Sequence, residues 1–342
     1  MKTSSSGDMP TSSRERIALA CAADAAYVRP LAAMVQSVLT NLASRREIDV
    51  FVLASGIESD DRSKLSESWN RQHATVHWLD ARDSQFAGVP LWGRMPVTTY
   101  YKLAVTDLLP ADLGRVIFLD SDLIMLGDVG ALWDADLGSH HLLAVQDRVV
   151  PYVSSPFGIS TWATLGLDRH AKYFNAGVMV IDVARWRRDQ VTQQVIEYLR
   201  KNRDDVFFWD QEGLNAVLAG RWGELDERWN CNVTVPGVFE RMMATAHTNG
   251  SSGSDSGPWV LHYTGNLKPW LYPRDPRRQR YFDYLDQTPW AGWRPTRSVT
   301  GSLIEFYESS GLRRLIYPVE QLGMRAIRAV SRRVVSSRSG QT

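Results

Sequence analysis

Residues 115–129 read Arg115-Val-Ile-Phe-Leu-Asp-Ser-Asp-Leu-Ile-Met-Leu-Gly-Asp-Val129, and this stretch decides the fold. The segment from Val116 to Leu119 is short and wholly apolar, which is typical of a strand buried inside a parallel sheet. Asp120, Ser121 and Asp122 follow at once, where the strand would leave the sheet. Because open α/β sheets bind ligands at the carboxyl ends of their strands, these polar residues are candidates for a functional site.

Asp120 and Asp122 are two positions apart, and residues with this spacing in an extended segment point to the same side. Two such carboxylates suit Mg²⁺ or Mn²⁺, and either ion would keep positions for water and a phosphate-bearing substrate. The alternative is a solvated turn at the end of the strand, because Asp and Ser are good turn residues.

Outward from this stretch, short apolar runs alternate with amphipathic segments. Strands are predicted at 17–23, 49–54, 75–79, 142–145, 173–182 and 259–262, and helices at 27–42, 60–69, 98–109, 131–133, 186–201 and 210–218. This alternation predicts a largely parallel α/β sheet with helices on both faces. The first strand is not followed by G-x-G-x-x-G, and the chain has no G-K-[ST] loop, so the usual dinucleotide and P-loop signatures are absent.

Polar residues within these elements are further candidates. Lys102 lies in the helix before the Asp120 strand, where a solvent-facing side chain is the simpler interpretation. Gly177 inside an apolar strand indicates close approach of a ligand or another backbone, and Asn175 before it offers a donor and an acceptor. A simple bend explains Asn-Ala-Gly equally well. Asp210 is a candidate N-cap of the helix that it begins.

The last distinctive stretch lies between residues 259 and 270. His262 ends a predicted strand and is followed by Gly265 and Lys268. This arrangement could add an imidazole to a metal site and bring backbone amides and a cation to phosphates. The preceding segment, 236–258, is rich in Gly, Ser and Asn, which predicts a surface loop able to close over a site.

Composition limits the classes of protein that are possible. The chain has 342 residues and a net charge of +1, so no global field favours nucleic acid. Two cysteines, Cys21 and Cys231, are too few for a disulfide framework and favour a reducing cytosol. No apolar run approaches the roughly 18 residues of a transmembrane helix. Residues 1–16 are polar and Ser/Thr-rich, which predicts a disordered leader rather than a signal peptide.

The C-terminal part is a distinct basic block. Residues 311–342 contain seven Arg and one acid, Glu320, a net charge of +6, which leaves about −5 for the remainder of the chain. Within residues 324–335, apolar positions share one helical face with Arg beside it. Such a helix can lie on an anionic membrane surface, each cation contributing about 1 kcal/mol. A helix docked on the body, or a frayed tail, is the alternative.

Four blocks together resemble glycosyltransferase family 8, and they occur in the order that this family shows. They are Phe118-Leu-Asp-Ser-Asp122, Phe174-Asn-Ala-Gly-Val178, Asp210-Gln211 and His262-Tyr-Thr-Gly-Asn-Leu-Lys-Pro-Trp270. The family holds retaining galactosyl- and glucosyltransferases of bacterial lipopolysaccharide, and glycogenin. The resemblance covers about residues 17–270 and implies a GT-A fold, with a Rossmann-like, mixed, mostly parallel sheet flanked by helices. We therefore expect a leader at 1–16, a GT-A domain at 17–285 and a basic tail at 286–342.

The resemblance also implies a role for each matching position. The implied ligands of a Mn²⁺ or Mg²⁺ on the donor diphosphate are Asp120, Asp122 and His262. The implied uracil and ribose contacts are Ala22, Ala23, Asp24, Tyr27 and Ser121, and the implied diphosphate contacts are Gly265 and Lys268. The implied donor-sugar contacts are Lys102, Asp147, Asn175, Asp210 and Gln211. Ala26 departs from the family, whose members often carry Asn there, so one nucleotide hydrogen bond is lost.

The family retains anomeric configuration, and a double displacement would need a carboxylate close to the anomeric carbon. Gln211 is a poor nucleophile, and Asp210 is the nearby acid that we name as the candidate nucleophile for such a mechanism. We therefore favour a front-face substitution in which Gln211 stabilises the oxocarbenium ion. In this scheme, the leaving phosphate oxygen helps to deprotonate the acceptor hydroxyl.

These expectations combine into one predicted function. It is metal-dependent, retaining transfer of a hexose from UDP-galactose or UDP-glucose to a lipid-linked or cell-surface glycan, by a cytoplasmic enzyme that is either soluble or held by the tail at the inner face of the membrane. Alternatives are a protein or small-metabolite acceptor, a catalytically silent nucleotide-sugar-binding protein, and a nucleotidyltransferase. The Asn175 and His262 blocks do not suit the last of these.

Overall fold

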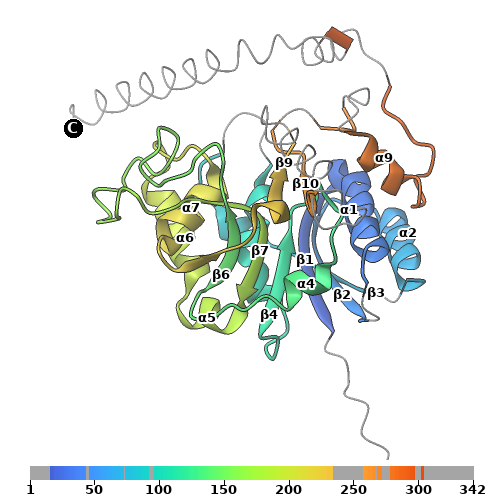
Figure 1. The fold of residues 1–342 in the computed structure, drawn as a ribbon, viewed down its shortest axis with the longest axis horizontal. Helices are drawn as coiled ribbons and strands as arrows, with labels where there is room; N and C mark the ends of the chain where they lie inside the picture. Colours follow the sequence, from blue (N-terminus) through green and yellow to red (C-terminus); the bar gives the residue numbers. More distant parts are fainter. Residues whose placement is uncertain are drawn as a thin grey trace, which may run out of the picture.

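The centre of the molecule is a seven-stranded sheet (Figure 1). The computed structural model describes residues 16–43, 46–72, 74–91, 96–233, 257–265, 268–271, 278–296 and 302–303. The strand order is β3-β2-β1-β4-β7-β6-β8. The strands are β1 (Ile17–Asp24), β2 (Ile48–Ser55), β3 (Ala74–Leu79), β4 (Arg115–Leu119), β6 (Leu142–Gln146), β7 (Phe174–Asp182) and β8 (Trp222–Glu224).

The sheet is mixed and mostly parallel, as expected. The β3, β2, β1 and β4 strands run parallel, and so do β6 and β8. Only β7 runs against both of its neighbours, β4 and β6. The amino end of β7 therefore lies at the edge of the sheet where β1 and β4 finish. As a result, Asn175 at the start of β7 and Asp120 after the end of β4 lie at the same edge, and the Asp120 amide donates to the Gly177 carbonyl at 2.9 Å.

A second, three-stranded sheet follows the central strand. It has the order β5-β10-β9, formed by Leu123–Met125, Val260–His262 and Cys231–Asn232. The β5 strand begins one residue after Asp122, and β10 pairs with it antiparallel. The chain thus turns from the large sheet into the small one through the Asp120-Ser121-Asp122 segment.

Helices flank the sheet on the side of β1–β3 and on the side of β6 and β7 (Figure 1). The α-helices are α1 (Val28–Thr40), α2 (Ser59–Asn70), α3 (Val105–Leu108), α4 (Val129–Trp133), α5 (Val183–Arg188), α6 (Val191–Lys201), α7 (Trp209–Leu218) and α9 (Gln279–Leu285). The 3₁₀ helices are η1 (Ala25–Tyr27), η2 (Asp83–Phe86), η3 (Val97–Ala104) and η4 (Glu227–Asn230). The α1 and α2 helices lie beside β1–β3, and α5–α7 lie beside β6 and β7.

Two helix predictions were wrong in form. The single helix expected at 98–109 is the 3₁₀ helix η3 followed by the one-turn α3. The β-branched and aromatic residues of Val97–Tyr101 have low α-helix propensity, which permits the tighter winding. The helix expected at 186–201 is divided into α5 and α6 by Gln190, whose φ is 50°. Next to it, the Asp189 carboxylate is held by His141 at 2.6 Å and Arg221 at 2.7 Å, which fixes the break.

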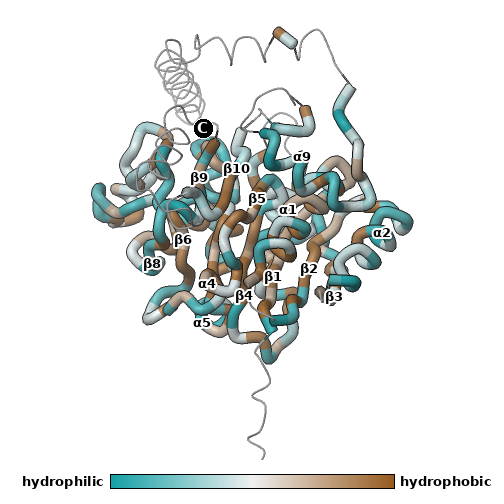
Figure 2. The backbone as a smooth tube through the Cα atoms, turned by 45° about the vertical axis from the view of Figure 1, so that its right-hand side comes forward, coloured by the Kyte–Doolittle hydropathy of each residue, from teal (hydrophilic) through white to brown (hydrophobic). Residues whose placement is uncertain are grey.

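The core lies within and around the sheet. The tube coloured by hydropathy is brown along the central strands and mostly teal on α2 (Figure 2). Side chains of β1, β4 and β7 are almost all buried, as expected for strands covered on both faces. Cys21 and Cys231 are both buried.

Some sequence predictions fall outside the described residues. They are the leader except Arg16, nearly all of the 236–258 loop, the 324–335 helix and the tail except 286–296 and 302–303. The proposed domain boundaries stay predictions. In the described part of the chain, no helix combines the length and apolar character needed to cross a membrane.

Candidate active site

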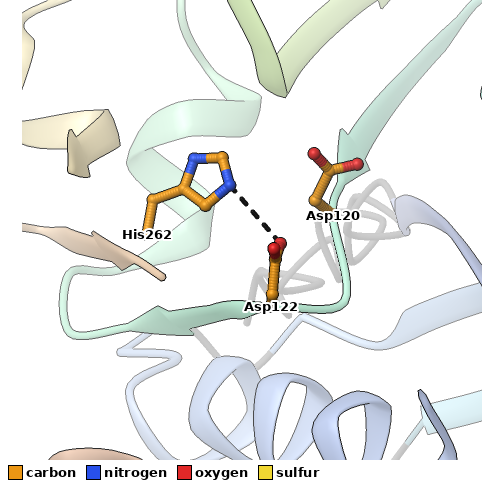
Figure 3. A group of neighbouring side chains, drawn as sticks. All are labelled: Asp120, Asp122 and His262. Carbon is orange, nitrogen blue, oxygen red and sulfur yellow. Dashed lines mark ion pairs between the residues drawn. The ribbon is translucent and has the colours of Figure 1, made fainter. Parts of the chain in front are cut away.

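Two sheets bring the three predicted metal ligands together at the carboxyl edge of β4. Pairing of β10 with β5 places His262 opposite Leu123, the residue after Asp122. The side chains of Asp120, Asp122 and His262 converge on one point (Figure 3), and one ligand atom from each lies within 4.8 Å of the others. His262 Nε2 lies 3.4 Å from Asp122 Oδ1. Residues far apart in sequence thus form one cluster of oxygen and nitrogen ligands.

Lys268 completes this cluster with a positive charge. Its Nζ forms an ion pair with Asp122 Oδ2 and donates to the Tyr263 carbonyl at 2.7 Å. Burial alone would raise the pKa of Asp122, but the adjacent Lys268 and His262 lower this pKa well below its usual range. Asp122 is therefore an anion at neutral pH, as a metal ligand must be.

Lys102 is buried, so the simpler interpretation of a solvent-facing lysine was wrong. Its Nζ lies 2.8 Å from Asp120 Oδ1 and 3.0 Å from Asp210 Oδ2, and only 7% of the residue is exposed. Burial lowers the pKa of Lys102, but Asp120 and Asp210 outweigh this effect and raise it. Lys102 thus joins the metal-ligand cluster to the start of α7 as a permanent cation.

Three of the expected sugar-contact residues, Asp147, Asn175 and Gln211, form one hydrogen-bonded group. Asp147 Oδ2 accepts from Asn175 Nδ2 at 3.0 Å and from Gln211 Nε2 at 3.1 Å, and Gln211 Oε1 accepts from the Ala176 amide at 3.1 Å. A register shift between β6 and β7 pairs Val145 with Asn175 and leaves the next residues of β7 out of the ladder. Irregularities of this kind re-aim side chains toward sites.

The α7 helix carries Asp210 and Gln211, and its start differs from the prediction. Phe208 occupies the N-cap position, so Asp210 is not the N-cap but a first-turn residue whose carboxylate meets Lys102. Burial raises the pKa of Asp210, and Lys102 offsets this only in part. Asn215 fixes the helix to β7 by bonding both the amide and the carbonyl of Phe174, at 2.8 and 2.9 Å.

The predicted nucleotide residues lie on the β1 side of the same edge. Ser121 Oγ donates to the Ala22 carbonyl at 2.7 Å. Ala23, the next residue near the end of β1, is buried. Asp24 Oδ1 accepts from the amides of Ala26 and Tyr27 at 2.9 and 3.2 Å, so it caps η1. One carboxylate oxygen of Asp24 is therefore used in shaping the turn.

Tyr27 ends η1 and lies near Asp122, Asp24 and Asp120, whose charges influence it. Its ring meets Trp270 edge-on at 5.5 Å, and burial together with Asp122, Asp24 and Asp120 raises its pKa, which keeps the hydroxyl protonated. Gly265 has a φ of 70°, a conformation that suits glycine, in the turn between His262 and Lys268. All the predicted site residues thus lie along one edge of the sheet.

Asn230 is a site residue that the sequence did not reveal. Its Oδ1 lies 2.8 Å from His262 Nδ1, and its Nδ2 donates to Asn175 Oδ1 at 2.9 Å. The only sequence signal is weak: a polar residue at the start of the short run Cys231-Asn-Val233. Asn230 is nevertheless 8% exposed and connects two predicted site residues.

The donor set fits a divalent cation. Two carboxylates and an imidazole are ligands for Mn²⁺ or Mg²⁺, with Mn²⁺ better suited to the nitrogen. The contact from His262 Nδ1 to Asn230 leaves Nε2 facing Asp122. A ligating His commonly uses its second ring nitrogen in this way.

This fold and this cluster define an α/β enzyme with a carboxylate–imidazole centre at the sheet's carboxyl edge. The chain belongs to Glycosyl transferase family 8, whose sequence profile matches residues 18–273, and it is a glycosyltransferase. It is 28% identical to General stress protein A of Bacillus subtilis (strain 168) over 272 residues, which cover 78% of this chain and 92% of that protein.

Two further comparisons agree with this membership. The lipopolysaccharide 1,2-glucosyltransferase of Escherichia coli (strain K12) is 25% identical over 304 residues, covering 85% of this chain and 83% of that protein. The crystal structure of the galactosyltransferase LgtC in complex with donor and acceptor sugar analogues superposes with a TM-score of 0.65 at 25% identity. It covers 83% of this chain and 98% of that one. The expected GT-A fold is thereby confirmed.

Gly177→Ala is expected to displace His262. An added Cβ would lie 2.3 Å from His262 Cε1 and 2.9 Å from Nδ1, closer than van der Waals contact allows. We expect Mn²⁺ affinity to fall by about 10-fold or more, the scale seen when support of a metal-ligating His is disturbed. Isothermal titration with MnCl₂ measures this. Gly114→Ala is the matched control, because its Cβ would meet nothing within 4 Å. Equal affinities in both variants would contradict the prediction.

Proposed function

We propose that the chain transfers a hexose from UDP-galactose or UDP-glucose, with retention of configuration, to a hydroxyl of a lipid-linked or cell-surface glycan. The observation that carries the proposal is the convergence of Asp120, Asp122 and His262 beside Lys268. A diphosphate needs positive charge at this place, and the fold offers it at the edge where such sheets bind nucleotides. The names of the relatives, a glucosyltransferase and a galactosyltransferase, support a hexose.

Some of these residues would neutralise the charge of the diphosphate, and others would orient the nucleotide and the sugar. Asp120, Asp122 and His262 would hold Mn²⁺ or Mg²⁺, which supplies Lewis-acid stabilisation of the leaving diphosphate when bound. Lys268 adds a cation for the same developing charge, and Gly265 offers a backbone amide. The uridine is contacted by the carboxyl end of β1 (Ala22, Ala23 and Asp24), together with Tyr27 and Ser121. Lys102, Asp147, Asn175, Asp210 and Gln211 orient the sugar.

The hydrogen bonding around Asp147 favours a front-face substitution. A double displacement needs a carboxylate free to attack the anomeric carbon. Asp147 Oδ1 accepts from the amides of Val149 and Val150 at 2.7 and 2.9 Å, while Oδ2 accepts from Asn175 and Gln211. Asp210 is paired with Lys102. Gln211, held at both ends of its amide, keeps one lone pair on Oε1 to stabilise an oxocarbenium ion.

Asp210→Asn tests this mechanism. We expect turnover to stay within about tenfold of wild type, because the variant keeps the side chain's shape and Lys102 keeps Asp120 as its partner. Gln211→Ala should lose more in the same assay. A loss of about a thousandfold or more in Asp210→Asn, with unchanged thermal unfolding, would instead identify Asp210 as the nucleophile.

The acceptor is proposed from the basic tail. Seven Arg in residues 311–342 would hold the enzyme at an anionic inner membrane surface, where a lipid-linked glycan is available. Deleting these residues should abolish sedimentation with anionic vesicles and leave hydrolysis of the donor intact. Sedimentation that persists after the deletion would exclude this role.

The function itself is tested by UDP release from a panel of UDP-sugars, with Mn²⁺ and with EDTA. Slow metal-dependent release from one sugar would support the proposal and identify the donor. Pyrophosphate as the product would indicate a nucleotidyltransferase. Metal-dependent binding of UDP without any hydrolysis would show that the acceptor is required for turnover. The absence of both binding and hydrolysis would overturn the proposal.

A further inference from the structure

A chain of side-chain hydrogen bonds runs from His262 to Asp147. His262 Nδ1 lies 2.8 Å from Asn230 Oδ1, Asn230 Nδ2 lies 2.9 Å from Asn175 Oδ1, and Asn175 Nδ2 lies 3.0 Å from Asp147 Oδ2. His262, Asn230 and Asp147 are each less than 9% exposed. Bulk water therefore has little access to replace these bonds.

The direction of every bond in the chain is fixed at its Asp147 end. A carboxylate oxygen is an acceptor, and the backbone amides of Val149 and Val150 hold the Asp147 side chain in place. Asn175 must therefore present its NH₂ group to Asp147. Its oxygen then faces the Gly177 amide at 3.0 Å, which can only donate. Two independent neighbours thus impose the same orientation on the Asn175 amide.

This orientation propagates to the histidine. Because Asn175 presents its oxygen to Asn230, Asn230 must present its NH₂ group in return, and its own oxygen faces His262. That oxygen can only accept, so Nδ1 of His262 carries the proton. Nε2, the nitrogen that faces Asp122 at 3.4 Å, is then the ring nitrogen that can offer a lone pair to a metal.

We infer that Asn230 is a positioning residue that sets the tautomer of His262 for metal binding and connects it to the sugar-contact residue Asn175. The inference rests on the proposed metal-dependent function. Asn230 ends η4 and immediately precedes β9, whose parallel pairing with β10 aligns Asn232 with His262. The small sheet therefore fixes the backbone of Asn230 relative to that of the ligand.

An amide is needed at position 230 because the two neighbours make opposite demands. His262 requires an acceptor, and Asn175 requires a donor. Alanine meets neither demand. Aspartate offers an acceptor to His262. It has no donor for Asn175, whose oxygen would then face another acceptor. The two variants therefore separate the metal function of Asn230 from its sugar function.

The test is titration of each purified full-length variant with MnCl₂, following free Mn²⁺ by electron paramagnetic resonance, beside donor turnover. Asn230→Ala is expected to bind Mn²⁺ about 10- to 100-fold more weakly than wild type. Asn230→Asp is expected to recover most of this affinity but to remain slow in turnover. Asn41→Ala is the control, because Asn41 bonds Ser37, Met125 and Tyr284 away from the chain.

A second measurement needs no variant at position 230. In ¹⁵N-histidine-labelled protein without added metal, with the signals of His262 identified by their loss in His262→Gln, the Nδ1-protonated tautomer is expected. Protonation at Nε2 instead, or unchanged Mn²⁺ affinity in Asn230→Ala, would overturn the inference while leaving the proposed function intact. Aspartate and alanine variants equally weak in Mn²⁺ binding would overturn it as well. Failure of wild type to bind Mn²⁺ would remove the proposed function and the inference with it.

Discussion

Asp122→Ala is expected to lower metal-dependent transfer by about a thousandfold, corresponding to about 4 kcal/mol of lost transition-state stabilisation. The substitution removes the carboxylate that meets both His262 Nε2 and Lys268 Nζ. It therefore takes away a ligand and also leaves Lys268 without its anion. Steady-state UDP release at saturating Mn²⁺, together with Mn²⁺ titration of the variant, measures the two effects separately.

Asp128→Ala is the matched control for this prediction. Asp128 belongs to the same stretch, but its carboxylate caps α4 by accepting from the Gly130 amide at 2.9 Å. Its loss should cost about 1 kcal/mol of stability and leave Mn²⁺ affinity unchanged. If Asp122→Ala retained wild-type turnover while folded, the assignment of Asp122 to the metal site would have to be abandoned.

Lys102→Met is expected to reduce the free energy of unfolding by about 3–5 kcal/mol, because breaking a buried ion pair leaves its charges uncompensated. Methionine keeps much of the volume of lysine, so the loss reports charge rather than packing. Asp120 and Asp210 would then be two nearby carboxylates without the cation that now joins them at 2.8 and 3.0 Å. Urea unfolding followed by circular dichroism measures the difference.

Lys172→Met provides the comparison at the surface. Lys172 pairs with Glu224, and the two side chains are 47% and 46% exposed. Its removal should change stability by at most about 1 kcal/mol. Adding Asp210→Asn to Lys102→Met should restore part of the lost stability, since one of the stranded carboxylates becomes neutral. Equal losses for the two lysine variants would contradict the buried ion pair.

The strands β1–β4, β6, β7 and β10 were predictable because each has a local cause, whereas the short β5, β8 and β9 were not predicted. Val116–Leu119 is an uninterrupted apolar run, and the alternation around it has the spacing of parallel α/β units. The antiparallel direction of β7 could not be predicted, because an apolar run has the same sequence pattern in a parallel and in an antiparallel strand. The break at Gln190 also has no local cause, since it depends on His141 and Arg221, which lie far away in sequence.

The candidate site was predictable where its residues stand in distinctive blocks. Asp120 and Asp122 were recognised as candidate metal ligands by their spacing directly after a strand. The burial of Lys102 could not be predicted in this way. It depends on two carboxylates, Asp120 after β4 and Asp210 on α7, which only the folded structure places beside Lys102. Asn230 is hidden for the same reason: its bond to His262 spans 32 positions and follows from the pairing of β9 with β10.

The long sequence separations within the site also bear on how the protein matures as it is synthesised. Ser121 contacts Ala22 across 99 positions, and Asp122 contacts Lys268 across 146. Because chains fold progressively from the N-terminus as they leave the ribosome, Asp120 and Asp122 emerge long before His262 and Lys268. The complete ligand set forms only when β10 joins β5. A divalent ion bound by the proposed ligands would therefore not nucleate folding of this enzyme but would stabilise a nearly finished protein by mass action.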